Sequence, residues 1–121
     1  MARIMVVDDS PTDVQNLKSM LSKAGYAVIE ATSGQDAIQR IKTEKPDCVI
    51  MDVVMPGING FQATRTLSKD PATAHIPILV ISSKNQETDR VWALRQGARD
   101  YIIKPVKEAD LIAKINTVLG H

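Results

Sequence analysis

Four short, continuous apolar runs constrain the fold of this chain more than any other feature. They occupy residues 4–7 (IMVV), 48–51 (CVIM), 78–81 (ILVI) and 101–103 (YII). Strands with one exposed face alternate apolar and polar residues, whereas continuous runs are typical of strands buried on both faces. A fifth run, residues 26–31 (YAVIEA), alternates in part, so we expect it at an edge of the sheet.

Segments with the apolar spacing of helices separate these runs. Ser10 and Pro11 are typical of a helix start, and Gly25 is typical of a helix end. Further helices are expected after Ser33, around residues 61–67, over residues 86–96 and over residues 111–119. Strand and helix therefore alternate five times with short connections, which predicts an α/β fold with a parallel sheet covered by helices on both faces.

The composition limits the class of protein. The chain has 121 residues, of which 44% are apolar, so we expect one domain spanning residues 1–121. Its net charge of +1 argues against a nucleic-acid partner, which would require a basic surface. A single cysteine, Cys48, lies in an apolar run and is expected to be buried. Neither a signal peptide nor a stretch of about 20 apolar residues is present, so we expect a cytoplasmic protein without a membrane segment.

Polar side chains stand where each apolar run stops. Asp8 and Asp9 follow the first run, Asp52 the second, Ser82 the third and Lys104 the fourth. A single Asp after a strand is usually a turn residue or a helix cap. In a parallel sheet, however, the carboxyl ends of all strands lie along one edge, and open sheets bind ligands there. The whole set together therefore predicts a binding site.

Three carboxylates at one edge repel each other unless they are protonated or bound to a cation. A hard divalent cation with oxygen ligands suits them, and Mg²⁺ fits better than zinc because His75 and His121 are isolated and expected on the surface. Mg²⁺ commonly binds phosphate oxygens, and an aspartate can form an acyl phosphate. Lys104 and Ser82 would stabilise such a group. The chain lacks a GxxxxGK[ST] loop, so the phosphoryl donor should be another molecule.

Four segments in this order resemble a known family. They are VVDDS (6–10), MDVVMPGINGF (51–61), VISS (80–83) and GARDYIIKP (97–105). Together they resemble the receiver domain of bacterial two-component response regulators, in particular the single-domain, CheY-like kind. The resemblance covers the whole chain. It implies a flavodoxin-like, doubly wound five-stranded parallel sheet in the order 2-1-3-4-5 with five helices.

The resemblance also implies a role for each site residue. Asp52 is the expected phosphoacceptor. The Mg²⁺ ligands are expected to be Asp8, Asp9, Asp52 and the backbone carbonyl of Val54. Ser82 and Tyr101 match the switch residues, and Lys104 matches the lysine that pairs with the phosphoryl group. On phosphorylation, the resemblance implies that Ser82 moves toward the phosphoryl oxygens and that Tyr101 turns inward. The bond between Lys104 and Pro105 is expected to be cis.

The resemblance further implies a signalling role. A histidine kinase would phosphorylate Asp52, and the face made by the fourth helix, fifth strand and fifth helix would then dock a target protein. The chain would assist its own phosphorylation and dephosphorylation rather than act as an enzyme on a substrate. Residues 59–65 (NGFQATR) and 84–101 (KNQETDRVWALRQGARDY) resemble regulators of type IV pilus twitching motility of the PilH type.

Several alternatives stay open at this point. The chain can serve as a phosphate sink or relay, as an unphosphorylated scaffold, or as an aspartate-nucleophile phosphatase. The phosphatases usually carry an acid two residues after the nucleophile, where this chain has Val54, and they need a substrate cap. The apolar Val54 also predicts slow spontaneous dephosphorylation. Trp92, in the expected fourth helix, is either a packing residue or a docking residue.

Overall fold

The computed structural model describes residues 1–120, and His121 with its expected surface position lies outside the described residues. The elements are β1 (Arg3–Val7), α1 (Pro11–Lys23), β2 (Ala27–Ala31), α2 (Gly34–Glu44), β3 (Cys48–Asp52), α3 (Gly60–Lys69), β4 (Ile78–Ser82), α4 (Glu87–Arg95), β5 (Asp100–Ile103) and α5 (Glu108–Leu119). The strands form a parallel sheet in the order β2-β1-β3-β4-β5. The predicted fold class is confirmed, and β2 lies at an edge as expected.

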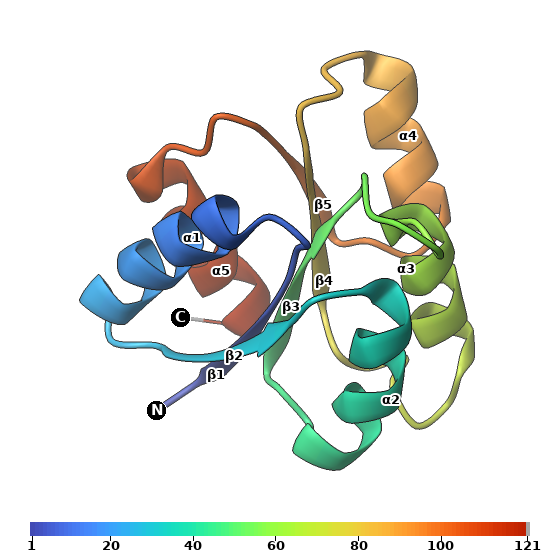
Figure 1. The fold of residues 1–121 in the computed structure, drawn as a ribbon, viewed down its shortest axis with the longest axis horizontal. Helices are drawn as coiled ribbons and strands as arrows, with labels where there is room; N and C mark the ends of the chain where they lie inside the picture. Colours follow the sequence, from blue (N-terminus) through green and yellow to red (C-terminus); the bar gives the residue numbers. More distant parts are fainter. Residues whose placement is uncertain (121) are drawn as a thin grey trace.

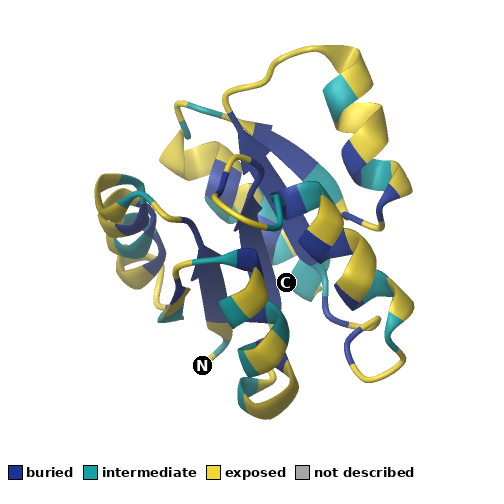
Figure 2. Cartoon of the chain, turned by 45° about the vertical axis from the view of Figure 1, so that its right-hand side comes forward, coloured by how far each residue is buried: buried dark blue, intermediate teal, exposed yellow. Residues whose placement is uncertain are grey.

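Helices cover both faces of the sheet. Figure 1 shows α1 and α5 on one side and α2, α3 and α4 on the other. Successive strand residues point to opposite faces, so Met5 and Val7 pack in the core beneath α2, α3 and α4, whereas Ile4 and Val6 pack beneath α1 and α5. The strands are therefore buried throughout their centre, while the outer faces of the helices are exposed (Figure 2). This two-sided burial explains the continuous apolar runs.

Local side-chain contacts define where several helices begin. The Ser10 hydroxyl accepts a hydrogen bond from the backbone N–H of Asp13, with Pro11 in the first turn. Ser33 caps α2 in the same way. Asn59 and Gln62 form a reciprocal capping box at the start of α3. Serine and asparagine oxygens thus satisfy backbone donors that a helix start leaves unpaired.

The strand register places the ends of four strands at one edge of the sheet. Val7 lies opposite Met51, and Asp52 lies opposite Ile81. Ser82 in turn lies opposite Ile103, the residue before Lys104. Polar residues far apart in the sequence therefore follow the strands at neighbouring positions. None of the described helices has the length and apolar character needed to cross a membrane.

Candidate functional site

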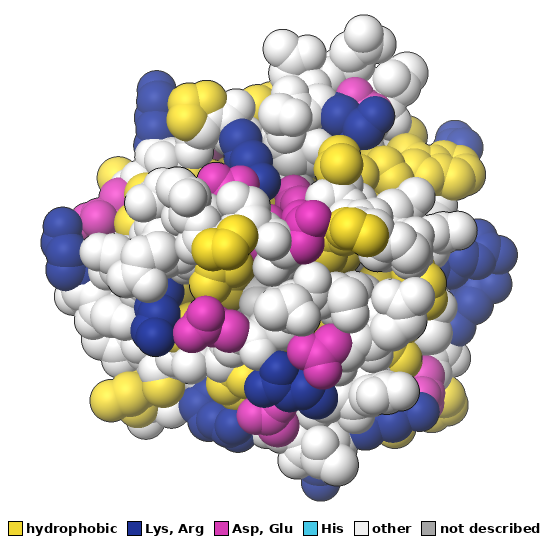
Figure 3. Space-filling model, viewed as in Figure 1, with side chains coloured by type: hydrophobic (Ala, Val, Ile, Leu, Met, Phe, Trp, Pro, Cys, Tyr) yellow, Lys and Arg dark blue, Asp and Glu magenta, His cyan; other side chains and the backbone are white. Residues whose placement is uncertain are grey.

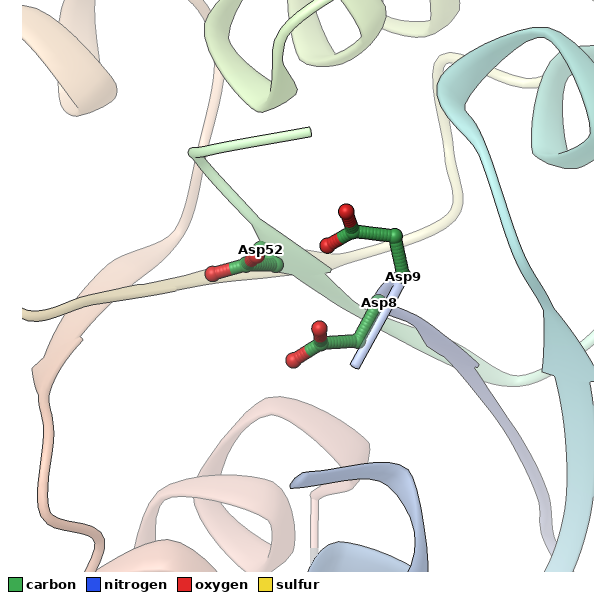
Figure 4. A group of neighbouring side chains, drawn as sticks. All are labelled: Asp8, Asp9 and Asp52. Carbon is green, nitrogen blue, oxygen red and sulfur yellow. The ribbon is translucent and has the colours of Figure 1, made fainter. Parts of the chain in front are cut away.

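Three carboxylates meet at the carboxyl ends of β1 and β3. One oxygen each of Asp8, Asp9 and Asp52 lies within 4.8 Å of the others. Figure 4 shows Asp8 and Asp9 leaving the end of β1 and facing the same space as Asp52 at the end of β3. Asp8 and Asp52 are 1% and 4% exposed, whereas Asp9 is exposed. The site thus concentrates negative charge in a largely buried corner with one side open to solvent.

Lys104, which follows β5, reaches into this corner. Its Nζ lies 3.2 Å from Asp52 Oδ1, 3.4 Å from Asp8 Oδ2 and 2.8 Å from Asp13 Oδ2. On the face drawn in Figure 3, acidic side chains gather near the centre with a basic side chain beside them. The Lys104–Pro105 peptide bond is cis. The structure therefore brings together the acids and the lysine that follow separate strands in the sequence.

The charges in the site shift two pKa values. Burial and the negative charge of Asp8 raise the pKa of Asp52 from 3.8 to about 6, although Lys104 opposes this shift. Burial alone would lower the pKa of Lys104, but the hydrogen bond to Asp13 and the charges of Asp52 and Asp8 raise it above its ordinary value. Lys104 therefore stays charged, but its single positive charge does not neutralise the negative charge of the three acids that it contacts. The excess negative charge and the oxygen-only ligands fit a hard divalent cation.

Ser82 and Tyr101 are joined through the backbone of Lys84. The Ser82 hydroxyl, at the end of β4, accepts a hydrogen bond of 3.1 Å from the Lys84 N–H. The Tyr101 hydroxyl donates a bond of 2.8 Å to the Lys84 carbonyl oxygen, and burial raises the pKa of Tyr101. Both side chains are buried. Tyr101 is turned inward here, whereas the sequence-based expectation links that orientation to the phosphorylated protein.

The loop after Asp52 depends on a glycine. A Cβ added to Gly60 would lie 2.0 Å from the carbonyl oxygen of Asp52 and 2.8 Å from its carbonyl carbon. The Gly60 N–H also donates a 2.9 Å hydrogen bond to the Val53 carbonyl oxygen. Only glycine allows α3 to begin this close to the backbone of Asp52. The side chain of Val54, within the loop, is 62% exposed at the rim of the site.

Sequence reasoning missed Asp13, which makes the shortest contact to Lys104. The signal for it was weak, because an acid in the first turn of a helix is commonly explained by the helix dipole alone. Trp92 proved to be 49% exposed, beside the exposed Val91 on α4, so packing does not account for it. Cys48 is buried as expected, and burial raises its pKa to about 12.

Comparison with known proteins gives a consistent set of relatives. Residues 4–116 match the response regulator receiver domain. The chain is 56% identical over 120 residues to protein PilH of Pseudomonas aeruginosa, covering 99% of each sequence. It is 37% identical over 118 residues to the chemotaxis protein CheY of Thermotoga maritima, covering 96% of each.

Among solved structures, the chain resembles the receiver domain of a sensor histidine kinase from Pseudomonas aeruginosa PAO1. The TM-score is 0.91 and the identity is 28%, with 99% of this chain and 98% of that chain covered. A magnesium ion is coordinated in the active site cleft of that receiver domain. The resemblance extends over the elements that carry the acids and the lysine described above.

Proposed function

The chain belongs to the response regulator receiver domains of two-component signalling, and on this premise we propose that it accepts a phosphoryl group on Asp52 from a histidine kinase in a Mg²⁺-dependent reaction. The observation that carries the proposal is the contact of Lys104 with Asp52 and Asp8 beside the exposed Asp9. We further propose that residues 1–121 act as one receiver domain in the cytoplasm, and that the chain is a phosphoacceptor rather than an enzyme with a separate substrate.

Asp8, Asp9 and Asp52 would hold Mg²⁺ together with the backbone carbonyl of Val54. When bound, the ion would offset negative charge on the carboxylates and on the phosphoryl oxygens. The raised pKa of Asp52 supports this assignment, because it means that the acids disfavour a further negative charge when no cation offsets them. The magnesium ion in the related histidine kinase receiver domain supports it as well.

In the phosphoryl step, a carboxylate oxygen of Asp52 attacks the phosphorus of the phosphohistidine. The new P–O bond forms as the P–N bond breaks, and the electron pair stays on the imidazole nitrogen, which is then protonated. The pKa of about 6 leaves Asp52 mostly ionised at pH 7, so it is available as the nucleophile. Lys104 stands 3.2 Å away to stabilise the phosphoryl oxygens, and Ser82 offers a hydroxyl donor at the end of β4.

The signal would pass from Ser82 to the face formed by α4, β5 and α5. Phosphorylation adds a charge of about −1.5 to −2 beside Ser82, which would draw its hydroxyl away from the Lys84 N–H. Because Tyr101 bonds the carbonyl of the same Lys84, that movement would change how Tyr101 is held. The exposed side chains of Trp92 and Ile103 then offer an apolar contact for a target protein.

The pathway is proposed by similarity. The identity to PilH over nearly the full length of both chains supports a role in type IV pilus twitching motility or a related chemotaxis-like system. The apolar side chain of Val54 favours a long-lived phosphoryl group, since it cannot orient an attacking water by hydrogen bonding. A long lifetime suits a docking signal, and it suits a relay better than a sink that must discharge quickly.

The central test is incubation with acetyl phosphate and Mg²⁺ followed by intact-mass spectrometry. We expect one phosphoryl adduct in the natural protein and in Asp110→Asn, which removes an exposed acid of α5. The adduct should be absent in Asp52→Asn. No adduct in the natural protein would favour a scaffold, and turnover of small phosphate esters would favour a phosphatase.

Trp92 provides a test of the proposed switch, because it is the chain's single tryptophan. Its fluorescence emission should change when acetyl phosphate and Mg²⁺ are added to the natural protein, since phosphorylation would rearrange the face on which it lies. The same addition to Asp52→Asn serves as the control for direct effects of the reagents. An unchanged spectrum in a fully phosphorylated sample would argue against movement of this face.

A further inference from the structure

We propose that Asp13 is a positioning residue that competes with Asp52 for the Lys104 ammonium. It thereby weakens the stabilisation that Lys104 gives to the phosphoryl group on Asp52. This inference rests on the proposed function and adds a residue to it. The contact is formed between the first turn of α1 and the residue after β5, so it joins segments 91 positions apart. Removing the Asp13 charge should accelerate phosphorylation through Lys104.

The distances rank the three partners of the ammonium. Asp13 Oδ2 lies 2.8 Å from Nζ, whereas Asp52 Oδ1 lies at 3.2 Å and Asp8 Oδ2 at 3.4 Å. Strong charge-assisted N–H···O bonds fall at about 2.7–2.9 Å, so only the contact with Asp13 has that length. An ammonium has three donors, and its best-formed hydrogen bond here goes to an acid outside the proposed metal ligands. Lys104 therefore makes a longer and weaker contact with Asp52 than with Asp13.

The start of α1 holds Asp13 in place. Its backbone N–H donates to the Ser10 hydroxyl at 3.4 Å, which makes it part of the helix cap. The Ser10 N–H in turn donates to Asp8 Oδ1 at 2.9 Å. Ser10 thus connects two of the three acids that contact Lys104. An acid in this first turn is also favoured by the helix dipole.

Differences in burial make the Asp13 contact the easiest of the three to release. The Asp13 side chain is 40% exposed, whereas those of Asp52 and Asp8 are 6% and 1% exposed. Water can therefore solvate the Asp13 carboxylate when Lys104 leaves it, and half-exposed ion pairs contribute little to stability. Asp13 and Lys104 also line a cavity of about 390 Å³, which gives the lysine stem room to move.

A phosphoryl group on Asp52 would compete with Asp13 for the Lys104 ammonium. Lys104 then moves toward the phosphoryl oxygens, and water solvates the Asp13 carboxylate in its place. Asp13 therefore holds Lys104 in reach of the site and opposes its full transfer to the new anion. Asp13→Asn removes that opposition while keeping the size of the side chain.

The test is a double-mutant cycle with acetyl phosphate and saturating Mg²⁺, followed by intact-mass spectrometry. Asp13→Asn should raise the phosphorylation rate about two- to fivefold, the range expected for a partly exposed charge contact. In a Lys104→Met background the same substitution should change the rate less than twofold. Asp13→Glu should restore a rate near that of the natural protein, and Asp110→Asn should leave the rate unchanged. Equal effects in both backgrounds, or no acceleration, would overturn the proposal.

A second measurement does not depend on phosphorylation. The NMR signals of the Lys104 ε-methylene group should shift in Asp13→Asn and stay unchanged in Asp110→Asn. An unshifted Lys104 signal in Asp13→Asn would overturn the contact itself. If the natural protein forms no adduct, the proposed function fails, and this NMR comparison alone decides whether Asp13 holds Lys104.

Discussion

Asp52→Asn should stabilise the folded protein in the absence of divalent cations. Asp52 is 4% exposed and lies beside Asp8, so its ionised form is disfavoured in the folded protein. Its folded pKa is about 6, against an ordinary value of 3.8 that applies to the unfolded chain. Asparagine has a similar shape and carries no charge. The substitution therefore removes an unfavourable ionisation and leaves the packing of the site nearly unchanged.

The size of the effect follows from the two pKa values. Each unit of difference corresponds to about 1.4 kcal/mol, so ionising Asp52 reduces the free energy of unfolding by up to about 3 kcal/mol at neutral pH. The attraction of Lys104 for Asp52 is already contained in this figure, because it is one of the causes of the folded pKa. Since the folded state binds the proton more tightly, the penalty is absent below pH 3.8. It grows as the pH rises toward 6 and is constant above that.

The assay is urea denaturation in EDTA at a series of pH values between 4 and 8. The free energy of unfolding of Asp52→Asn should exceed that of the natural protein by up to about 3 kcal/mol at pH 7.5, and by little at pH 4. Asp110→Asn makes the same chemical change at an exposed acid. Its free energy of unfolding should stay within about 0.5 kcal/mol of that of the natural protein. Mg²⁺ should reduce this difference in the free energy of unfolding at pH 7.5, because it binds the folded natural protein more strongly than it binds folded Asp52→Asn.

Two results would refute this reasoning. The first is an Asp52→Asn variant that is less stable than the natural protein at pH 7.5 in EDTA. The second is a stability difference that does not change with pH, because the mechanism requires the difference to follow the ionisation of one carboxyl group.

Three further predictions concern other parts of the chain. Gly60→Ala should lower the free energy of unfolding by about 1–3 kcal/mol or more in urea denaturation, because its methyl group would clash with the Asp52 carbonyl; an unchanged midpoint would contradict the packing described. Val54→Asn should shorten the lifetime of the phosphoryl adduct by adding a group that can orient water, and an equal or longer lifetime would count against that role. Cys48 should react with a thiol reagent only on unfolding, since it is buried and its pKa is raised to about 12; rapid labelling of the native protein would disprove this.

Much of the fold could be predicted from the sequence because its signals are local and repeated. Each buried strand appears as an unbroken apolar run, and serine, proline and glycine mark several helix ends. The convergence of Asp8, Asp52 and Lys104 was also predictable, because parallel strands place their carboxyl ends at one edge. These inferences required only the order of the elements.

The rest depends on side-chain geometry that the order of the elements does not determine. Asp13 reads as an ordinary helix-start acid, and its contact with Lys104 depends on how α1 meets the residue after β5. The inward position of Tyr101 depends on a single backbone acceptor, the carbonyl of Lys84. The exposure of Trp92 depends on which side of α4 packs against the sheet. In each case the residue type is known from the sequence, but its contacts and its exposure are determined by how the helices and strands pack together.

The site draws its members from the carboxyl ends of β1, β3, β4 and β5, which span positions 8 to 104. Each strand end supplies only one or two of these residues, so the site forms only when β1, β3, β4 and β5 are assembled in the sheet. Under the proposed function, a misfolded or partly translated copy would therefore neither accept phosphoryl groups from a kinase nor transmit a signal. The capacity to be phosphorylated would then serve as a measure of the intact fraction of molecules in a sample.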